Sequence, residues 1–357
     1  MDDFDARTDE LLEVLGRYEG QRLFTAVIGS PDPDGLASAW ALSFLAKHVG
    51  VRMDILTFEV LSRPDNLAFV RMLDIPFKRV RLRLPRIKYA GFAVVDRQNA
   101  RLPVPVKKGL PLVAHIDHHV KVRSRAAFVQ QEPRAGSTAS IMAHHFAHRT
   151  DVLVDDPEEA CRVCTALMYG IRTDTGDFLN AEPFDFEAAA LIAPWVTPEL
   201  VRAVVRTPLG RHFLDALSSA LKTAHTENGL TVAFAGRVGG RNRDAIGQTA
   251  DFLATGEDTE TVVVFGNVNG TIVGSLRTSD PDLDSYRMLD EALSTALGSH
   301  VDCGGRRFAG GFQIPPSQFP SGDDISSTEL VANALRSFWN SKKKVRRRRK
   351  GARSRAR

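Results

Sequence analysis

Clusters of acidic and histidine residues follow apolar, β-prone stretches at three places in this chain of 357 residues. The clusters are Asp32-Pro33-Asp34 after residues 22–28, Asp96 after 91–95, and Asp117-His118-His119 after 112–116. Helical patterns between the early stretches predict parallel strands, in an α/β sheet that is covered on both faces. Such sheets bind ligands at the carboxyl ends of their strands. The three clusters are therefore predicted to meet at one edge of a single sheet.

The side chains in these clusters are suitable ligands for a hard divalent cation. Carboxylates with one imidazole suit manganese or magnesium, and a carboxylate shared by two ions can hold them about 3.5 to 4 Å apart. A fourth cluster, Arg172-Thr173-Asp174-Thr175-Gly176, supplies another carboxylate. None of the four clusters contains cysteine, which argues against a structural zinc site. Together they indicate a two-metal phosphoesterase.

The order of these segments resembles the DHH phosphoesterase family, which is named after the triplet found here at Asp117-His118-His119. Segments 135–141 (AGSTASI) and 169–176 (YGIRTDTG) are similar to family segments as well. Segments 274–277 (GSLR) and 303–311 (CGGRRFAGG) resemble the family's associated C-terminal domain. The nanoRNase and exopolyphosphatase-related members of the family look most similar.

The resemblance implies a mostly parallel-sheet domain joined by a helix to a smaller α/β domain. We expect an N-terminal helix at 1–19, the DHH catalytic domain at 20–195, a helical linker at 196–227, the DHH-associated substrate-binding domain at 228–338, and a basic, disordered tail at 339–357. Substrate would lie in a cleft between the two domains. The oligomeric state is open, and a homodimer is one option.

The resemblance also assigns roles to individual residues. The metal ligands would be Asp32, Asp34, Asp96, His118 and Asp174. His119 would complete the catalytic set by facing the substrate phosphate, and Asp117 would orient an imidazole. In the second domain, Arg277 and a glycine-rich turn of Gly304, Gly305 and Arg306 would bind phosphate, because arginine bonds phosphate bidentately and glycines let backbone N–H groups approach it.

The implied activity is hydrolysis of a phosphoester by two-metal activation of water, with Mn²⁺ or Mg²⁺ as the cofactor. Short oligoribonucleotides and 3′-phosphoadenosine 5′-phosphate are the expected substrates, and exopolyphosphatase or cyclic-dinucleotide phosphodiesterase activity is an open alternative. One position departs from the family pattern: Ile28 stands where the family places a metal-binding histidine. A nucleotide-binding regulator without turnover is therefore the rival interpretation.

Charge is distributed unevenly along the chain. The net charge is +4, but residues 342–357 alone carry 11 basic and no acidic side chains, which leaves −7 for the remainder. Such a block is expected to contact nucleic acid or another polyanion without sequence specificity. No stretch approaches the roughly 20 apolar residues of a membrane span, and the acidic start is unlike a signal peptide. A cytoplasmic protein without a membrane partner is expected.

Overall fold

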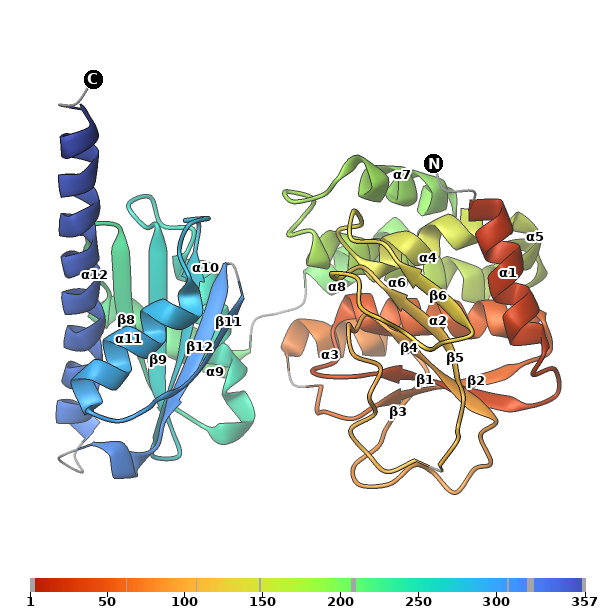
Figure 1. The fold of residues 1–357 in the computed structure, drawn as a ribbon, viewed down its shortest axis with the longest axis horizontal. Coiled ribbons are helices and arrows are strands. Elements are labelled where there is room, and N and C mark those ends of the chain that lie inside the picture. Colours follow the sequence, from red (N-terminus) through yellow and green to blue (C-terminus); the bar gives the residue numbers. More distant parts are fainter. Residues whose placement is uncertain are drawn as a thin grey trace. The chain divides into compact units, whose positions relative to one another are not determined.

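The computed structural model describes residues 4–61, 63–106, 108–147, 149–206, 210–306, 308–319 and 324–354. The chain divides into two compact units, residues 1–207 and 208–357. Each unit has a six-stranded sheet of its own, with its own hydrophobic core (Figure 1).

The sheet of the first unit is parallel throughout. Its strands are β1 (Arg22–Val27), β2 (Arg52–Thr57), β3 (Phe77–Arg79), β4 (Gly91–Val95), β5 (Leu112–Asp117) and β6 (Phe128–Gln131). They lie in the order β3-β2-β1-β4-β5-β6, which confirms the predicted sheet and adds β6, a short strand that sequence analysis missed. The order reverses between β1 and β4, and a ligand crevice is expected at the carboxyl ends of strands at such a point.

The helices of the first unit cover one face of this sheet. They are α1 (Phe4–Gly16), α2 (Pro33–His48), α3 (Pro64–Leu73), α4 (Thr138–Ala147), α5 (Thr150–Asp155), α6 (Pro157–Asp174), α7 (Pro183–Ile192) and α8 (Pro198–Val205), with the 3-10 turn η1 (Ala193–Trp195). Nearly every side chain of α2 is buried, because this small-residue helix packs against the sheet and also against α4 and α6.

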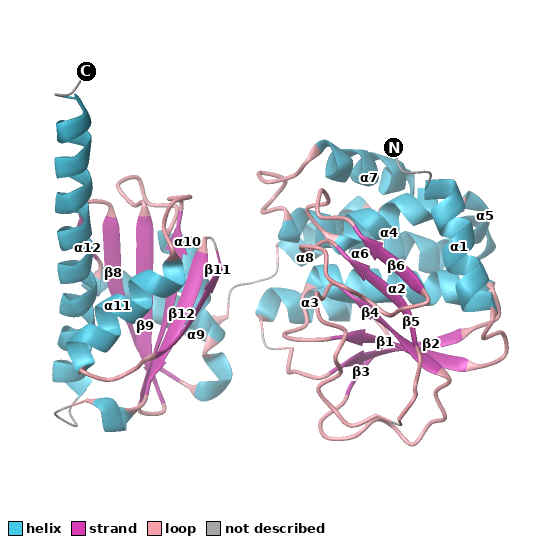
Figure 2. Cartoon of the chain, in the orientation of Figure 1, coloured by secondary structure: helices cyan, strands magenta, loops and turns pink. Residues whose placement is uncertain are grey.

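Loops rather than helices cover the opposite face; sequence analysis predicted a sheet covered on both faces, and on this face the cover comes from the connections that link β3, β4 and β5 (Figure 2). Phe24, Phe92 and Val94 on this face pack against Val80 and Val104 from the loops. The connections 80–90 and 96–111 contain four prolines between them, which lack the N–H of a helix interior. We call this side of the sheet the loop face.

The second unit contains a mixed sheet with helices on both faces. Its strands, β7 (His225–Glu227), β8 (Leu230–Val238), β9 (Thr261–Val268), β10 (Thr271–Thr278), β11 (Asp302–Arg306) and β12 (Ala309–Ile314), lie in the order β11-β12-β10-β9-β8-β7. Helices α9 (Arg211–Thr223) and α10 (Asp244–Leu253) cover one face, and α11 (Ser285–Leu297) and α12 (Asp324–Ser354) cover the other. The short 3-10 turns are η2 (Gly240–Asn242) and η3 (Pro316–Gln318).

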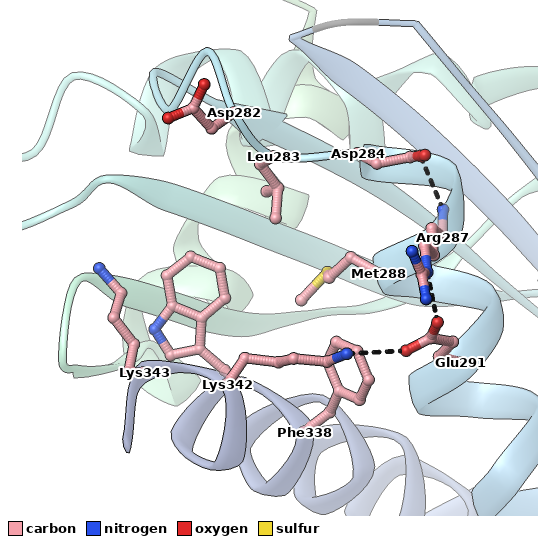
Figure 3. Close-up of a pocket in the computed structure, with 10 residues that line it drawn as sticks. Asp282, Leu283, Asp284, Arg287, Met288, Glu291, Phe338, Lys342 and Lys343 are labelled. Carbon is pink, nitrogen blue, oxygen red and sulfur yellow. Dashed lines mark hydrogen bonds and ion pairs between the residues drawn. The ribbon is translucent and has the colours of Figure 1, made fainter. Parts of the chain in front are cut away.

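The tail expected to be disordered is instead the continuation of α12, which runs to Ser354. Lysine and arginine are good helix formers, so the basic sequence can extend a helix already packed through Val331, Leu335 and Trp339. The first tail residues, Lys342 and Lys343, line a pocket of about 260 Å³ between α11 and α12 (Figure 3). Lys342 is paired with Glu291 at 3.0 Å there.

No single helix among the described residues has the length and hydropathy to span a membrane. One bent pair, Pro183–Trp195 with Pro198–Val205, meets the criteria of length and composition only when its two parts are combined.

Gly274 in β10 provides a test of packing in the second unit. A Cβ at this position would overlap the ring of Phe312, its partner on β12 and a buried core residue. We expect Gly274→Ala to destabilise the protein by about 2 kcal/mol in denaturant unfolding, because inserting a methyl group into a filled core forces neighbours to move. The matched control is Gly304→Ala, where an added Cβ meets nothing within 4 Å; equal stability of the two variants would contradict this packing.

Candidate metal centre

The predicted clusters meet at the carboxyl edge of the parallel sheet. Asp32 and Asp34 lie at the start of α2 just after β1, Asp96 follows β4, and His118 follows β5. Two groups of side chains have donor atoms within 4.8 Å of one another: Asp96, His118 and His119 form one, and Asp34, His118 and Asp174 form the other. His118 belongs to both groups, so the two candidate metal positions are neighbours.

Asp34 is held by the first turn of α4. Its Oδ2 accepts a hydrogen bond from the backbone N–H of Thr138 at 2.8 Å, and its Oδ1 accepts one from Ala139 at 2.6 Å. The carboxylate is buried, with 1% of the residue exposed. The free N–H groups and the positive dipole end of a helix favour an anion at this position. The contact fixes the direction of the carboxylate before any ligand binds.

Asp96 sits on an unusual backbone conformation. Its φ of 51° is in the left-handed region, which aspartate tolerates better than most residues. Its backbone N–H donates a hydrogen bond to Ile116 O of β5 at 3.0 Å, which extends the pairing of β4 with β5 by one residue. The turn therefore begins directly at the end of β4. The side chain then lies 3.5 Å from His118 Nε2. Strain of this kind is common where a functional side chain must be aimed.

His118 is oriented by a backbone carbonyl. Its Nδ1 lies 3.3 Å from Ala135 O, which favours the tautomer with the proton on Nδ1. Its Nε2 lies 3.5 Å from Asp96 Oδ1 and 3.3 Å from Asp174 Oδ2. In that tautomer Nε2 offers a lone pair toward both carboxylates, which is the state that a metal ligand requires.

His119 is oriented by the buried carboxylate of Asp117. The distance between His119 Nδ1 and Asp117 Oδ1 is 2.7 Å, and Asp117 is fully buried. This contact is the one expected of a carboxylate that orients an imidazole. His119 is also one of the potential donors beside Asp96, whereas sequence analysis placed it toward the substrate. Apart from His119, every residue of the two donor groups was expected as a metal ligand.

Asp32 and Asp174 occupy the rim of the cluster. Asp32 caps α2, because its Oδ1 accepts a hydrogen bond from Gly35 N–H at 2.9 Å. It belongs to neither donor group found among the described residues, although an added Cβ at Gly35 would lie 3.3 Å from Asp32 Oδ1 and 3.2 Å from Asp96 Oδ2. Asp174 is the last residue of α6, with about a third of its side chain exposed.

The crowding of carboxylates shifts their protonation equilibria. Burial raises the pKa of Asp34 well above its usual value, and the charges of Asp96 and Asp174 raise it further. Burial likewise raises the pKa of Asp96, followed by the charges of Asp32 and Asp174. Both carboxylates therefore cost the fold free energy when ionised without a counter-charge. A bound cation would remove that cost, so the donor set fits a divalent metal ion.

Two glycines allow the surrounding elements to approach this cluster. An added Cβ at Gly35 would lie 3.2 Å from Asp96 Oδ2. One at Gly170 in α6 would lie 3.1 Å from Ala139 Cβ and 3.2 Å from Asp34 Cα. The absence of side chains at these positions lets α2, α4 and α6 converge on the same point.

Sequence analysis missed the residue that supports the start of α4. Asp185 in α7 is completely buried, and its carboxylate accepts hydrogen bonds from Gly136 N–H at 2.9 Å and from Ser140 Oγ–H at 2.6 Å. It also caps its own helix by accepting from Glu182 N–H at 2.9 Å. The only sequence signal was the helix start at Glu182-Pro183, which does not reveal a partner in α4.

The expected phosphate-binding residues of the second unit have structural partners. Arg277 Nε is paired with Asp251 Oδ1 at 2.5 Å, and its Nη1 donates to Leu276 O at 2.8 Å. The expected glycine-rich turn was wrong, because Gly304 and Gly305 lie inside β11 and pair with β12. Gly305 is required there because an added Cβ would lie 3.0 Å from Tyr286 N in α11. The side chain of Arg306 lies outside the described part of the chain.

Comparison with known proteins identifies relatives of this architecture. Residues 229–327 match the DHHA1 domain. The chain is 31% identical over 312 residues to a protein of Methanocaldococcus jannaschii named uncharacterized protein MJ1633; the match covers 86% of this chain but only 61% of that protein. The chain thus spans about three-fifths of the length of this relative.

Solved structures share the fold at low sequence identity. An exopolyphosphatase-related protein from Bacteroides fragilis aligns with a TM-score of 0.64 and 12% identity, over 93% of this chain and 96% of that one. A structure of exonuclease RecJ bound to manganese aligns with a TM-score of 0.45 and 14% identity, over 94% and 95% of the two chains. The first of these likenesses shows the fold.

Asp96→Asn tests the electrostatic cost of the cluster. The pKa of Asp96 is raised in the folded state, so folding favours its protonated form. The stabilisation from this preference is complete below the usual carboxyl pKa and is lost as pH rises through the raised pKa. At a pH above the raised pKa and without metal, Asp96→Asn should therefore raise the melting temperature by about 2–4 °C, the shift that roughly 1 kcal/mol produces at this size. Asparagine also tolerates the left-handed backbone.

The same variant should lose stabilisation by manganese, because its amide cannot supply the carboxylate charge. Asp282→Asn, at an exposed carboxylate in the second unit, is the matched control and should leave both melting temperatures unchanged. Calorimetric melting with and without Mn²⁺ provides the measurement. A metal-free Asp96→Asn protein less stable than the parent would show that the charge is compensated without metal.

Proposed function

Because the chain has the fold of the DHH-family phosphoesterases and carries a DHHA1 domain, we propose that it is a phosphoesterase that uses divalent metal ions. The observation that carries the proposal is the pair of donor groups that share His118 at the carboxyl edge of the sheet. Neighbouring sites of this kind suit phosphoester hydrolysis, in which two ions act on one phosphate group.

Five residues would hold the ions. By the assignment that the family resemblance implies, Asp34, Asp96, His118 and Asp174 would hold one ion, and Asp32 with the shared Asp96 would hold the other; the donor group of Asp34, His118 and Asp174 supports the first set. Oxygen ligands with a single imidazole suit Mn²⁺ or Mg²⁺. When bound, such ions would activate a water molecule and polarise the phosphoryl group.

The chain itself contributes orientation and positive potential to the reaction. Asp117 holds the His119 ring by Nδ1, which leaves the other ring nitrogen to contact a phosphate oxygen. The first turns of α2 and α4 both begin at the cluster, so their dipoles favour the anionic substrate. His119 thus acts as a substrate-positioning group in this proposal, while the aspartates and His118 hold the metals.

The proposed substrates are short oligoribonucleotides and 3′-phosphoadenosine 5′-phosphate. The DHHA1 domain supports this choice, with Arg277 and the Gly304–Arg306 segment as the phosphate-binding groups. Arg277 would exchange its ion pair with Asp251 for a phosphate, since guanidinium bonds phosphate bidentately. Inorganic polyphosphate and cyclic dinucleotides are the alternatives, because each presents a similar phosphate end or diester.

The basic tail belongs to the same proposal as a non-specific contact to nucleic acid. Lys342 and Lys343 are engaged by Glu291 and Glu260, so the cations from Lys344 onward are the ones assigned to this contact. A nucleotide-binding regulator without turnover is the second candidate, and Ile28 favours it. This residue packs against the apolar cluster of the loop face and offers no ligand where a histidine would serve.

Turnover separates the two candidates. We expect Mn²⁺-dependent hydrolysis of a dinucleotide or of 3′-phosphoadenosine 5′-phosphate, and a loss of at least about 100-fold in kcat/KM for Asp96→Asn, because the shared anchor of both ions is removed. Asp282→Asn should retain parental turnover. If Asp96→Asn turns over at the parental rate, the metal assignment fails; if neither protein turns over while both bind nucleotide, the regulator is correct.

Metal stoichiometry tests the consequence of Ile28. The position served by Asp32 and Asp96 has fewer protein ligands than the one around Asp34, His118 and Asp174. We therefore expect calorimetric titration with Mn²⁺ to show one tight site, and a second, weaker site that strengthens when a nucleotide supplies phosphate oxygens. Ile28→His should tighten the weaker site. Two equally tight sites in the parent protein without nucleotide would contradict the unequal assignment.

A further inference from the structure

Positive charge is concentrated in three segments of the first unit, which are loops except for Lys78 and Arg79 at the end of β3. Residues 78–88 carry six lysines and arginines, residues 97–111 carry four, and residues 118–127 carry three, and none of these segments contains Asp or Glu. We call them the basic loops. Subtracting these 13 charges and the 11 of the tail from the net charge of +4 leaves −20 for the rest of the chain. The two basic regions therefore stand apart from an acidic protein.

Most cations of the basic loops have no carboxylate partner among the described residues. Twelve of the 13 lie in the described part of the chain, and all 12 are exposed. Among them, Lys78 alone has a carboxylate partner within the described residues, Asp54 at 3.1 Å. Elsewhere cations are often paired, as Lys47 is with Asp156 and Glu159. Uncompensated repulsion on this scale is relieved when a polyanion binds.

The fold brings the basic loops to one side of the sheet and to the metal centre. Val80 and Val104 anchor two of the loops on the loop face, where no helix lies in the described residues (Figure 2). Residues 97–111 follow Asp96 directly, and residues 118–127 begin with His118 and His119. A polymer bound along these loops would thus extend from the proposed metal ligands across the loop face.

Exposed apolar side chains alternate with the cations. Leu82, with 81% of its surface exposed, lies between Arg81 and Arg83, and Val120, with 72% exposed, precedes Lys121. Inorganic polyphosphate has no apolar group to contact such residues, and a duplex hides the faces of its bases. A single strand offers both phosphates and accessible base faces, so it can contact the cations and the apolar side chains together; these side chains are aliphatic, in place of the aromatic residues that stack on bases in many single-strand sites.

We propose that the basic loops form a docking surface for the backbone of single-stranded nucleic acid. Arg81, Arg83 and Arg86 contact successive phosphates, and the exposed leucine and valine side chains contact bases. Binding to this surface does not depend on turnover. Its second role, presenting the strand's phosphates to the metal centre, rests on the proposed function.

The test compares two full-length variants with the same change in net charge. Arg81→Glu/Arg83→Glu/Arg86→Glu reverses three cations of the basic loops. The control, Arg71→Glu/Arg206→Glu/Lys222→Glu, reverses three exposed cations that have no ion pair with any described residue and lie outside the loops and the tail. The affinity for a labelled single-stranded RNA of about 20 nucleotides is measured by fluorescence anisotropy in EDTA across a salt series. Both variants retain the tail, so its contribution cancels in the comparison.

The loop variant should bind at least about tenfold more weakly than the control, and its salt slope should be shallower by about 2, because each phosphate contact to a single strand contributes about 0.7. Melting temperatures matching the parent protein confirm folding. Affinities of the two variants within about twofold would overturn the proposal. So would equal loop-dependent binding of inorganic polyphosphate, of duplex RNA, or of phosphatidylcholine vesicles containing phosphatidylserine. Because EDTA abolishes metal-dependent turnover, failure of docking and failure of the phosphoesterase assignment are observed separately.

Discussion

The mutual repulsion of Asp34 and Asp96 is the constraint on which the first unit depends. Two buried carboxylates close to further acidic side chains are unfavourable in a low-dielectric environment. The fold offsets part of that cost with two N–H groups of α4 on Asp34 and with the imidazole of His118 beside Asp96. The remaining repulsion lowers the stability of the protein without a cation and favours the binding of one. Many functional sites reduce stability in this way.

Several longer-range features exist to maintain this arrangement. The start of α4 can hold Asp34 because Asp185 fixes the preceding turn at Gly136 and the hydroxyl of Ser140. Gly170 lets α6 approach closely enough to bring Asp174 to His118. The candidate metal centre is therefore supported by helices that contribute no donor atom to it, such as α7.

The two faces of the parallel sheet have different physical roles. Helices on one face bury the larger core, and α2 and α4 begin at the carboxyl edge. The loop face has a smaller core and carries exposed cations, of which Lys78 alone among those described has a carboxylate partner. Carboxylates gather at the edge of the sheet, and positive charge gathers in the basic loops beside it. An anionic ligand at this edge would contact a cation held by the carboxylates and the positive charges of the loops together.

The amino-acid sequence was sufficient to predict the strand-and-cluster pattern, because β-prone stretches followed by polar turns depend on neighbouring residues. The order of the acidic clusters, and the resemblance to the DHH family that rests on it, were also evident from the sequence. It did not predict the short β6, the loop face, the helical course of the tail, or the placement of Gly304 and Gly305 inside a strand. Each of these depends on packing partners distant in sequence, which override local preference.

The sequence by itself thus determined which side chains could bind metal and the sheet edge at which they would gather. Only the tertiary structure decided how they are held. Asp34 meets Ala139 across 105 residues of chain, and Gly136 meets Asp185 across 49. The carbonyl of Ala135 orients His118, and Asp251 engages Arg277. Such contacts leave no local pattern, because hydrogen-bond geometry and burial are set by the folding of distant segments onto one another.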